Sequence, residues 1–176
     1  MTTGSFPHML KKMVTNTGKS VSELSENNTV LLVFLRHFGC TFCREALAEI
    51  SLKKKSIEDG GTIIVFIHMA DEETADRYFS RYQLENAIHI SDPNCTLYTE
   101  FGLIKGNYRQ LLGFSSWMRG FQAGIVEGHG IGKQIGDGFQ MPGVFVIKNN
   151  MVRMQYIHKL SSDRPNYEAL AQCCEV

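Results

Sequence analysis

The chain has 176 residues, with 18 Lys and Arg against 18 Asp and Glu, 43% hydrophobic residues and five cysteines. A chain of this length is usually one domain, and it buries enough surface to form a core without metal or disulfide staples. Zero formal charge disfavours a nucleic-acid-binding protein, because neutralising phosphates requires clustered Lys and Arg. The odd cysteine count is not typical of a disulfide-scaffolded secreted domain, so the cysteines are free for chemistry.

The ends of the chain and its apolar runs bear on localisation. Residues 1–8 lack the apolar stretch of a secretory signal. The longest apolar runs, 30–35 and 63–67, are far shorter than the roughly 20 residues that span a bilayer. We therefore expect a soluble, cytoplasmic protein without a membrane partner. Thiols there are kept reduced, so a closely spaced Cys pair is catalytic or metal-binding rather than structural.

The first half of the chain predicts a strand, a helix and a second strand. Residues 29–35 form a continuous run of β-branched and aromatic residues, typical of a strand covered on both faces. Residues 41–55 predict an amphipathic helix, whose three final lysines complement the C-terminal end of the helix dipole. Residues 59–61, Asp-Gly-Gly, end the helix, and 62–67 predict another buried strand. This order implies a βαβ unit with parallel strands.

Two more helices are predicted before a glycine-rich region. Residues 71–73, Asp-Glu-Glu, open a helix whose apolar residues keep helical spacing up to Tyr82. Ser91-Asp92-Pro93 predicts a cap with Pro at the first helical position, and Gly102 ends that helix.

Residues 102–138 contain ten of the 16 glycines. Neither phosphate-binding pattern fits: Glu127 and Gln134 break the Walker spacing around Gly132-Lys133, and Ile135 breaks the dinucleotide pattern. We interpret 104–138 as an insertion into a single domain of 1–176, with a mobile loop. An amphipathic helix within it is predicted by Leu111, Phe114, Met118 and Phe121.

The C-terminal part predicts a hairpin and a helix. Residues 144–147 form a short apolar strand, Asn149-Asn150 suits a tight turn with positive φ, and 152–157 returns. Asp163-Arg164-Pro165 predicts the cap of a last helix that carries Tyr167.

Cys40-Thr41-Phe42-Cys43 is a C-x-x-C motif where the first strand meets the first helix. Unpaired backbone N–H groups and the positive dipole end stabilise a thiolate there, and lower a cysteine pKa below its free value of about 8.5. The first Cys can then attack a disulfide and the second can resolve the mixed intermediate. The alternatives are two inert core thiols, or half of a zinc site completed by Cys95, His68 or His89.

Residues 34–47, Phe-Leu-Arg-His-Phe-Gly-Cys-Thr-Phe-Cys-Arg-Glu-Ala-Leu, resemble the active-site segment of peroxiredoxin-like proteins related to selenoprotein L. These are a thioredoxin-fold branch of the alkyl hydroperoxide reductase/thiol-specific antioxidant (AhpC/TSA) superfamily. Segments 92–103 and 141–165 agree with the same branch, so the resemblance extends over roughly 30–170. It implies an α/β, thioredoxin-like fold: a central mixed sheet flanked by helices, with a helical glycine-rich insertion before a cis-proline.

The resemblance also implies roles for individual residues. Pro142 would take the cis-proline position beside the dithiol, and Met141 would offer backbone groups to the substrate. Phe38, Thr41, Phe42 and Arg36 would support the dithiol or line the substrate groove. Typical peroxiredoxins carry Pro-x-x-x-Thr-x-x-Cys, in which the peroxidatic Cys corresponds to Cys43; here Cys40 occupies the Thr position and the motif proline is missing.

Three functions follow as hypotheses. The first is an antioxidant thiol-disulfide oxidoreductase in which Cys40 attacks and Cys43 resolves, with electrons from thioredoxin, glutaredoxin or glutathione. The second is a thiol peroxidase that reduces hydroperoxides, with Cys43 peroxidatic and Cys40 resolving. The third is a non-enzymatic binding or regulatory module. No cofactor, metal or nucleic acid is expected.

The remaining candidates have less specific signals. His37 either stabilises the Cys40 thiolate or caps the loop. Cys95 is expected to be a packed core residue rather than a resolving thiol. Three alternatives remain open for the tail pair Cys173-Cys174. It has no role, it relays oxidising equivalents from the C-x-x-C pair, or it is a lipidation signal.

Overall fold

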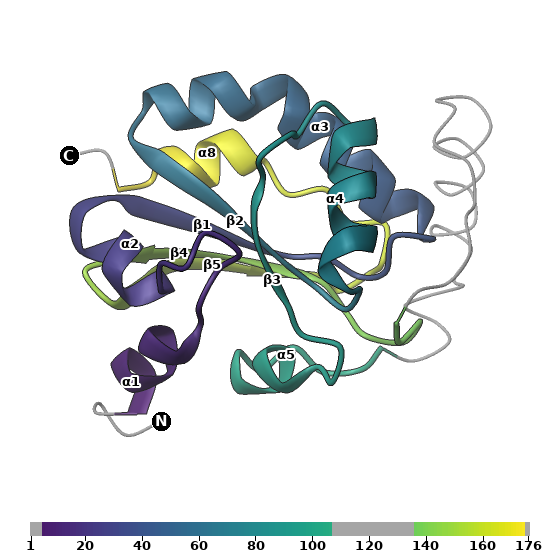
Figure 1. Cartoon of the computed structure of the whole chain (residues 1–176), viewed down its shortest axis with the longest axis horizontal. Helices are drawn as coiled ribbons and strands as arrows, with labels where there is room; N and C mark the ends of the chain where they lie inside the picture. Colours follow the sequence, from purple (N-terminus) through teal and green to yellow (C-terminus); the bar gives the residue numbers. More distant parts are fainter. Residues whose placement is uncertain (1–4, 107–135, 175–176) are drawn as a thin grey trace.

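The structure is a computed structural model that describes residues 5–106 and 136–174 (Figure 1). A five-stranded mixed sheet in the order β3-β2-β1-β4-β5 forms its centre. β1, β2 and β3 are parallel, whereas β4 is antiparallel to both β1 and β5. The strands are β1 Thr29–Phe34, β2 Thr62–His68, β3 Ile88–Ser91, β4 Gly143–Lys148 and β5 Met151–Ile157.

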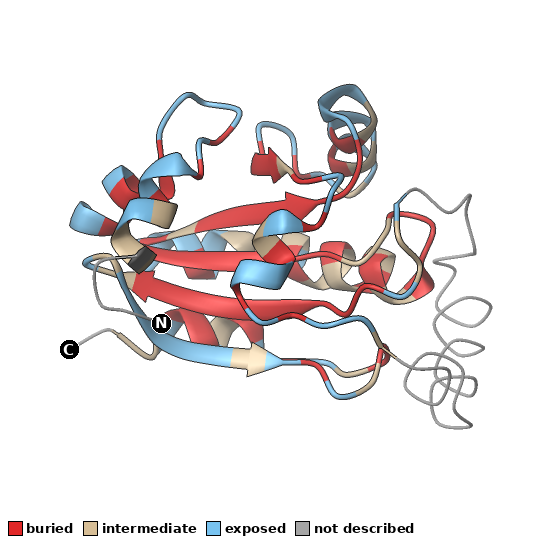
Figure 2. Ribbon diagram, turned by 90° about the horizontal axis from the view of Figure 1, so that it is seen from below, coloured by how far each residue is buried: buried red, intermediate tan, exposed pale blue. Residues whose placement is uncertain are grey.

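Helices cover both faces of the sheet, so the core has two parts. The described helices are α1 Ser5–Lys12, α2 Val21–Asn27, α3 Thr41–Asp59, α4 Glu72–Arg81, α5 Thr96–Glu100 and α8 Tyr167–Gln172. Alternate β1 residues such as Leu31 and Val33 pack on the side of α3, α4 and α8, while Val30 and Leu32 pack on the side of α1, α2 and α5. The central strand β1 is buried at every residue and its neighbours β2 and β4 are nearly so, whereas edge strand β5 is largely exposed (Figure 2).

The predicted βαβ unit and C-terminal hairpin are confirmed. β1 and β2 pair in parallel with Val30 opposite Ile63. Asn149 and Asn150 have φ angles of 53° and 58°, the two positive values that a tight hairpin turn requires. α3 continues past residue 55 to Asp59 and ends at the predicted Asp-Gly-Gly break, and its three lysines form ion pairs one turn away rather than lying in the last turn. These pairs are Lys53–Glu49, Lys54–Glu58 and Lys55–Asp59.

Two predicted helix starts are wrong. α5 begins at Thr96 rather than at Pro93, because the Asp92 carboxylate accepts hydrogen bonds from the backbone N–H groups of Thr96 and Leu97 at 3.0 and 2.8 Å. α8 begins at Tyr167 and is capped by Asn166, so the 163–165 segment lies outside the helix. Three elements, α1, α2 and β3, were not predicted.

Two expectations concern the segment before β4. The predicted insertion helix lies on residues 107–135, outside the described part of the chain. The expected cis-proline is wrong: none of the described peptide bonds is cis, so the bond between Met141 and Pro142 is trans. Trans is the intrinsically favoured form, even before proline.

Candidate active site

The C-x-x-C motif follows β1 and lies at the start of α3. β1 ends at Phe34, and Cys40 is the N-cap residue of α3, with extended backbone angles and no side-chain capping bond. Cys43 lies in the first turn of the helix. Both thiols therefore sit among the unpaired N–H groups at the positive end of the longest described helix, as the sequence predicts.

Arg36 contacts both sulfurs. Its guanidinium donates from Nη1 to Cys40 Sγ at 3.1 Å, and its backbone N–H donates to Cys43 Sγ, also at 3.1 Å. The other terminal nitrogen donates to the carbonyl of Gly138, which connects the loop to the segment before β4. Both cysteines are free thiols, with exposed fractions of 7% for Cys40 and 5% for Cys43.

These contacts give the two thiols different acidities. The hydrogen bond from the Cys43 side chain lowers the pKa of Cys40 to about 6 against the opposing effect of burial, and the Arg36 charge adds to this. Burial raises the pKa of Cys43 well above its ordinary value. At neutral pH the pair therefore holds a thiolate on Cys40 and a protonated thiol on Cys43.

The Phe38 side chain is buried rather than exposed to solvent, and it packs beneath the loop that leads to Cys40. It is 2% exposed, and its ring stacks on that of Tyr78 in α4 at a centroid distance of 4.7 Å. Arg44 Nε donates to the Phe38 carbonyl at 2.9 Å, with its guanidinium 5.7 Å from the Tyr78 ring centre. Phe38 thus supports the site, and Thr41 is buried at the start of α3.

A small cavity adjoins the dithiol. Its volume of about 20 Å³ is close to the space that one water molecule needs. Its lining includes Arg36, Cys40, Phe42, Cys43, Glu45 and Pro142. Arg164, also in the lining, forms an ion pair with the buried carboxylate of Glu45, which sequence reasoning missed because the two residues are distant in the chain.

Met141 is buried beside Pro142. Its side chain is 2% exposed. Its backbone N–H donates to the Ile104 carbonyl at 3.4 Å, and its carbonyl accepts from Gln140 Nε2 at 3.3 Å. The backbone groups expected to bind substrate are thus engaged within the chain.

His37 does not supply a positive charge to Cys40. Burial, together with the charges of Arg36 and Arg44, lowers the pKa of His37 to about 4, so the ring is neutral at pH 7. Its carbonyl accepts the Cys40 backbone N–H at 2.8 Å, which makes it a loop residue, the second of the two roles considered for it.

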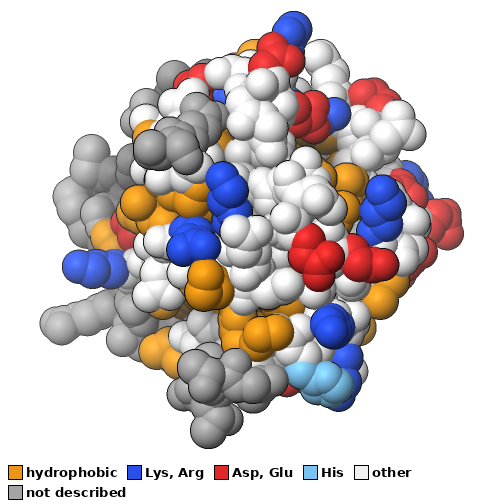
Figure 3. All heavy atoms as spheres, turned by 90° about the vertical axis from the view of Figure 1, so that its left-hand side faces the viewer, with side chains coloured by type: hydrophobic (Ala, Val, Ile, Leu, Met, Phe, Trp, Pro, Cys, Tyr) orange, Lys and Arg blue, Asp and Glu red, His pale blue; other side chains and the backbone are white. Residues whose placement is uncertain are grey.

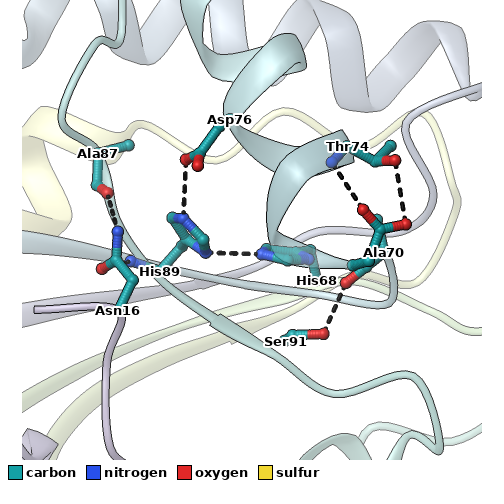
Figure 4. A network of polar contacts seen from close by, with 9 residues as sticks. Asn16, His68, Ala70, Thr74, Asp76, Ala87, His89 and Ser91 are labelled. Atoms are coloured by element: carbon teal, nitrogen blue, oxygen red, sulfur yellow. Dashed lines mark hydrogen bonds and ion pairs between the residues drawn. The ribbon is translucent and has the colours of Figure 1, made fainter. Parts of the chain in front are cut away.

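The other candidate histidines bond to each other (Figure 4). His68 Nε2 lies 2.9 Å from His89 Nδ1, and His89 Nε2 lies 3.1 Å from Asp76 Oδ1. The His68 ring centre is 5.6 Å from that of Phe38, so the network packs beneath the dithiol loop. Among the described residues, no group of three or more His, Cys, Asp and Glu is arranged to hold a metal ion.

The remaining cysteines are separate from the site. Cys95 is 9% exposed, and its thiol lies 3.3 Å from the sulfur of Met69, so the packing role is confirmed. Cys174 is held at the opposite end of β4, where its carbonyl accepts a hydrogen bond from Lys148 Nζ at 3.0 Å. This position disfavours a relay between the tail pair and Cys40, which was one of the three alternatives for Cys173-Cys174.

A thioredoxin-like sheet with an asymmetric dithiol at the start of a long helix defines a thiol-redox class of protein. The chain belongs to the AhpC/TSA family, whose sequence pattern matches residues 6–155. The finer assignment to the branch related to selenoprotein L stays a prediction.

Two curated proteins are similar to this chain in sequence. The thioredoxin-like protein AAED1, chloroplastic, of Arabidopsis thaliana is 24% identical over 88% of this chain and 65% of its own length. Prostamide/prostaglandin F synthase of Danio rerio is 25% identical over 94% of this chain and 83% of its own length. The chain thus spans slightly less than two thirds of the Arabidopsis protein.

Solved structures confirm the fold class. The Xanthomonas campestris bacterioferritin comigratory protein has a TM-score of 0.66 at 10% identity, covering 97% of this chain and 95% of its own. A yeast mitochondrial 1-Cys peroxiredoxin, whose structure was described for its thiol resolving mechanism via glutathione/thioredoxin systems, has a TM-score of 0.64 at 12% identity. The match covers 92% of this chain and 69% of the yeast chain. A putative thiol:disulfide interchange protein DsbE from Chlorobium tepidum has a TM-score of 0.56 at 19% identity, covering 91% and 86%.

The family match agrees with a thiol-based redox protein, whereas the solved structures, at 10–19% identity, show the fold alone. On localisation, no described helix has the length and apolar character needed to cross a bilayer. Because one relative is chloroplastic, a cytoplasmic location stays a prediction.

Proposed function

We propose that the protein is a thiol-disulfide oxidoreductase with an antioxidant role, in which Cys40 is the nucleophile and Cys43 resolves. The observation that carries this proposal is the position of Cys40 at the N-cap of α3 with its sulfur 3.1 Å from Arg36 Nη1, an arrangement in which the hydrogen bond from Cys43 and the charge of Arg36 lower the pKa of Cys40. The attacking group in disulfide exchange is the thiolate.

The steps follow from the positions of the two sulfurs. Cys40 Sγ attacks a substrate disulfide, forms a mixed disulfide and releases the first substrate thiolate. Cys43, in the first turn of α3, then loses its proton and attacks Cys40 Sγ, releasing the second thiolate. The Arg36 backbone N–H is placed to stabilise the Cys43 thiolate as it forms. Thioredoxin, glutaredoxin or glutathione would return two electrons to the Cys40–Cys43 disulfide.

A matched pair of variants tests the order of attack. Cys43→Ser lacks the resolving thiol, so it should accumulate a mixed disulfide at Cys40 with a small disulfide such as oxidised glutathione. Cys40→Ser should react at least about tenfold more slowly, because the remaining thiol has a raised pKa. Mass spectrometry after acid quenching measures both. Faster trapping by Cys40→Ser would refute the assignment.

The alternative is a thiol peroxidase in which Cys43 attacks a hydroperoxide and Cys40 resolves. The family match and the backbone N–H bonded to Cys43 favour it. Stopped-flow mixing of Cys40→Ser with hydrogen peroxide and an organic hydroperoxide tests it, because the peroxidase then leaves a sulfenic acid on Cys43. A sulfenic acid that forms on Cys40 in Cys43→Ser, and not on Cys43, would instead favour the first proposal.

The third hypothesis, a non-enzymatic binding module, gives no reason for a depressed thiol pKa. If wild-type alkylation showed Cys40 and Cys43 both titrating at or above their ordinary range, the oxidoreductase proposal would be abandoned in its favour.

A further inference from the structure

Cys173 and Cys174 form a second dithiol that the proposed function does not use. Cys173 is the C-cap residue of α8. The chain is fixed there by two hydrogen bonds: Lys148 Nζ to the Cys174 carbonyl at 3.0 Å, and Thr62 Oγ1 to the Ala171 carbonyl at 3.3 Å. Lys148 ends β4 and Thr62 begins β2, so this dithiol lies at the end of the inner strands that is opposite the C-x-x-C loop, near the C-terminus (Figure 1).

The distance from the C-x-x-C pair makes this a separate site. Gly143 at the start of β4 pairs with Phe34, just before the dithiol loop, whereas Lys148 is at the far end of the strand. Five residue steps of about 3.3 Å place the two ends of β4 about 17 Å apart. Thiol-disulfide exchange requires contact between sulfurs, so the tail pair does not exchange with Cys40 within one chain.

The two tail sulfurs already face each other. Cys173 Sγ and Cys174 Sγ are 3.5 Å apart, and both residues are partly exposed free thiols. Both also pack against the core on the α3 side of the sheet, which limits their side-chain freedom. Figure 3 faces this end of the molecule and shows hydrophobic side chains, the class in which cysteine is coloured, reaching the surface beside Lys and Arg side chains.

This spacing suits chelation better than a disulfide. Adjacent Cα atoms are about 3.8 Å apart, below the roughly 4.4 Å at which disulfides begin. By contrast, two sulfurs each about 2.3 Å from one bound atom lie about 3.3–3.8 Å apart at bond angles of about 90–110°. The observed 3.5 Å is in that interval, so the pair can chelate one atom without rearrangement.

The protonation state of Cys173 limits which classes of ligand the two tail thiols can bind. Burial and the neighbouring Cys174 raise the pKa of Cys173 to about 11, so its thiol keeps its proton at neutral pH. A divalent metal ion must displace thiol protons, and zinc takes four ligands where this pair supplies two. A trivalent arsenic compound with one organic substituent has two positions to fill, and it removes the thiol protons as water.

We propose that Cys173 and Cys174 form a chelation site for monosubstituted trivalent arsenicals. The reaction is R–As=O + 2 R′–SH → R–As(SR′)₂ + H₂O. Two arsenic–sulfur bonds form, the arsenic–oxygen bond breaks, and both thiol protons leave with the oxygen as water. Arsenic stays trivalent, so no oxidant or reductant is needed. The second bond forms intramolecularly, which resists displacement by monothiols.

The test uses the full chain carrying Cys40→Ser and Cys43→Ser, which leaves Cys95 and the tail pair as the cysteines. The reduced protein is treated with one equivalent of phenylarsine oxide and then with excess 2-mercaptoethanol. Intact-mass spectrometry should show one arsenic adduct per chain that survives the monothiol and is removed by 2,3-dimercaptopropanol. Adding Cys173→Ser or Cys174→Ser should lower retention at least about tenfold. Adding Cys95→Ser, the matched control, should leave it unchanged.

An adduct that 2-mercaptoethanol removes, or one that Cys173→Ser leaves intact, would overturn the proposal. If the Cys40→Ser/Cys43→Ser chain fails to fold, peptide mapping of the wild type treated with at least two equivalents of phenylarsine oxide decides the question, because Cys40 and Cys43 can then bind one equivalent without depleting the reagent. A monothiol-resistant adduct must then be found on the peptide containing 173–174, and its absence from that peptide refutes the site. None of these readouts depends on the redox activity proposed for Cys40.

Discussion

Arg36 serves the two sulfurs of the C-x-x-C motif through different atoms. Its guanidinium reaches Cys40 Sγ, while its backbone N–H reaches Cys43 Sγ. A substitution therefore removes the contact to Cys40 and leaves the backbone donor to Cys43 in place. The charge of Arg36 lowers the pKa of Cys40, so this side chain is open to a direct test.

Arg36→Met should raise the pKa of Cys40 by about one unit, since an opposite charge in contact shifts a pKa by about 1–3 units. Iodoacetamide alkylation across pH, followed by peptide mass spectrometry, gives the midpoint: near pH 6 in the wild type and higher in the variant. Arg153→Met on exposed strand β5 is the control. An unchanged midpoint in Arg36→Met would show that the guanidinium does not stabilise the thiolate.

The hydrogen bond from Cys43 is the largest cause of the low Cys40 pKa. Cys43→Ser keeps a hydroxyl donor in that position, whereas Cys43→Ala removes it. We expect the Cys40 pKa to rise in the order wild type, Cys43→Ser, Cys43→Ala, measured by the same alkylation experiment. Equal midpoints in the two variants would mean that the side-chain donor is unimportant.

At the level of elements, the β4–β5 turn is held by both its own backbone and the neighbouring helix. Asn149 has a φ of 53°, and its N–H donates to the Ser25 carbonyl in α2 at 2.7 Å. Asn150 bonds through its side chain and N–H to Ser25 Oγ, both at 3.2 Å. The turn thus couples the last hairpin to the first part of the chain.

Asn149→Val should destabilise the protein by about 1–2 kcal/mol, because a β-branched residue is strained at positive φ. Asn149→Gly, which adopts this conformation freely, should be at least as stable as the wild type. Urea unfolding followed by circular dichroism measures both. If Val and Gly gave the same midpoint, positive φ would not limit the turn.

An element could be predicted from the sequence only where its hydrophobic pattern was long enough or where turn residues marked it. β1, β2 and the β4–β5 hairpin have long apolar runs or a turn pair, and α3 has helical spacing, so these elements were found. β3 contains only four residues, too few to distinguish a strand by period. The start of α5 was misplaced because a side chain, Asp92, satisfies its first N–H groups from four residues away.

The candidate site likewise has one part that local sequence predicts and another that depends on tertiary folding. The position of Cys40 and Cys43 at the start of α3 follows from local sequence. The bond from Arg36 to Cys40 depends on how the intervening loop turns, and the Glu45–Arg164 pair depends on tertiary folding, so neither is encoded by spacing. The same holds for the contact of His68 with His89, which requires β2 and β3 to be neighbours.

Across the whole molecule, the sheet separates two cores that both exclude water, and buried histidines are neutral as a result. Burial lowers the pKa of His68 to about 3 and of His158 to about 4, from an ordinary value of 6.5. The unfolded chain binds protons at these rings below about pH 6.5, whereas the folded chain does not. The stability contributed by neutral histidines is therefore complete above that pH and is lost as pH falls toward about 4.

The free energy of unfolding should consequently be level near pH 7–8 and fall below about pH 6.5. Each of these histidines adds up to about 1.4 kcal/mol per pH unit to the slope. Urea unfolding at intervals between pH 7.5 and 5 measures the effect as a slope of the unfolding free energy against pH, which His158→Gln should reduce by about one proton. A slope that His158→Gln leaves unchanged would contradict the assignment of His158 as a buried neutral ring.

The stabilised thiolate at Cys40 has a consequence for the redox potential of the dithiol. The hydrogen bonds to Cys40 Sγ favour the reduced, ionised pair, and the Cys40–Cys43 disulfide contains no anion for them to stabilise. Stabilising the reduced form raises the reduction potential, by about 30 mV for each 1.4 kcal/mol in a two-electron couple. We therefore expect this site to be more oxidising than a dithiol of ordinary acidity, and to depend on its electron donor to remain reduced.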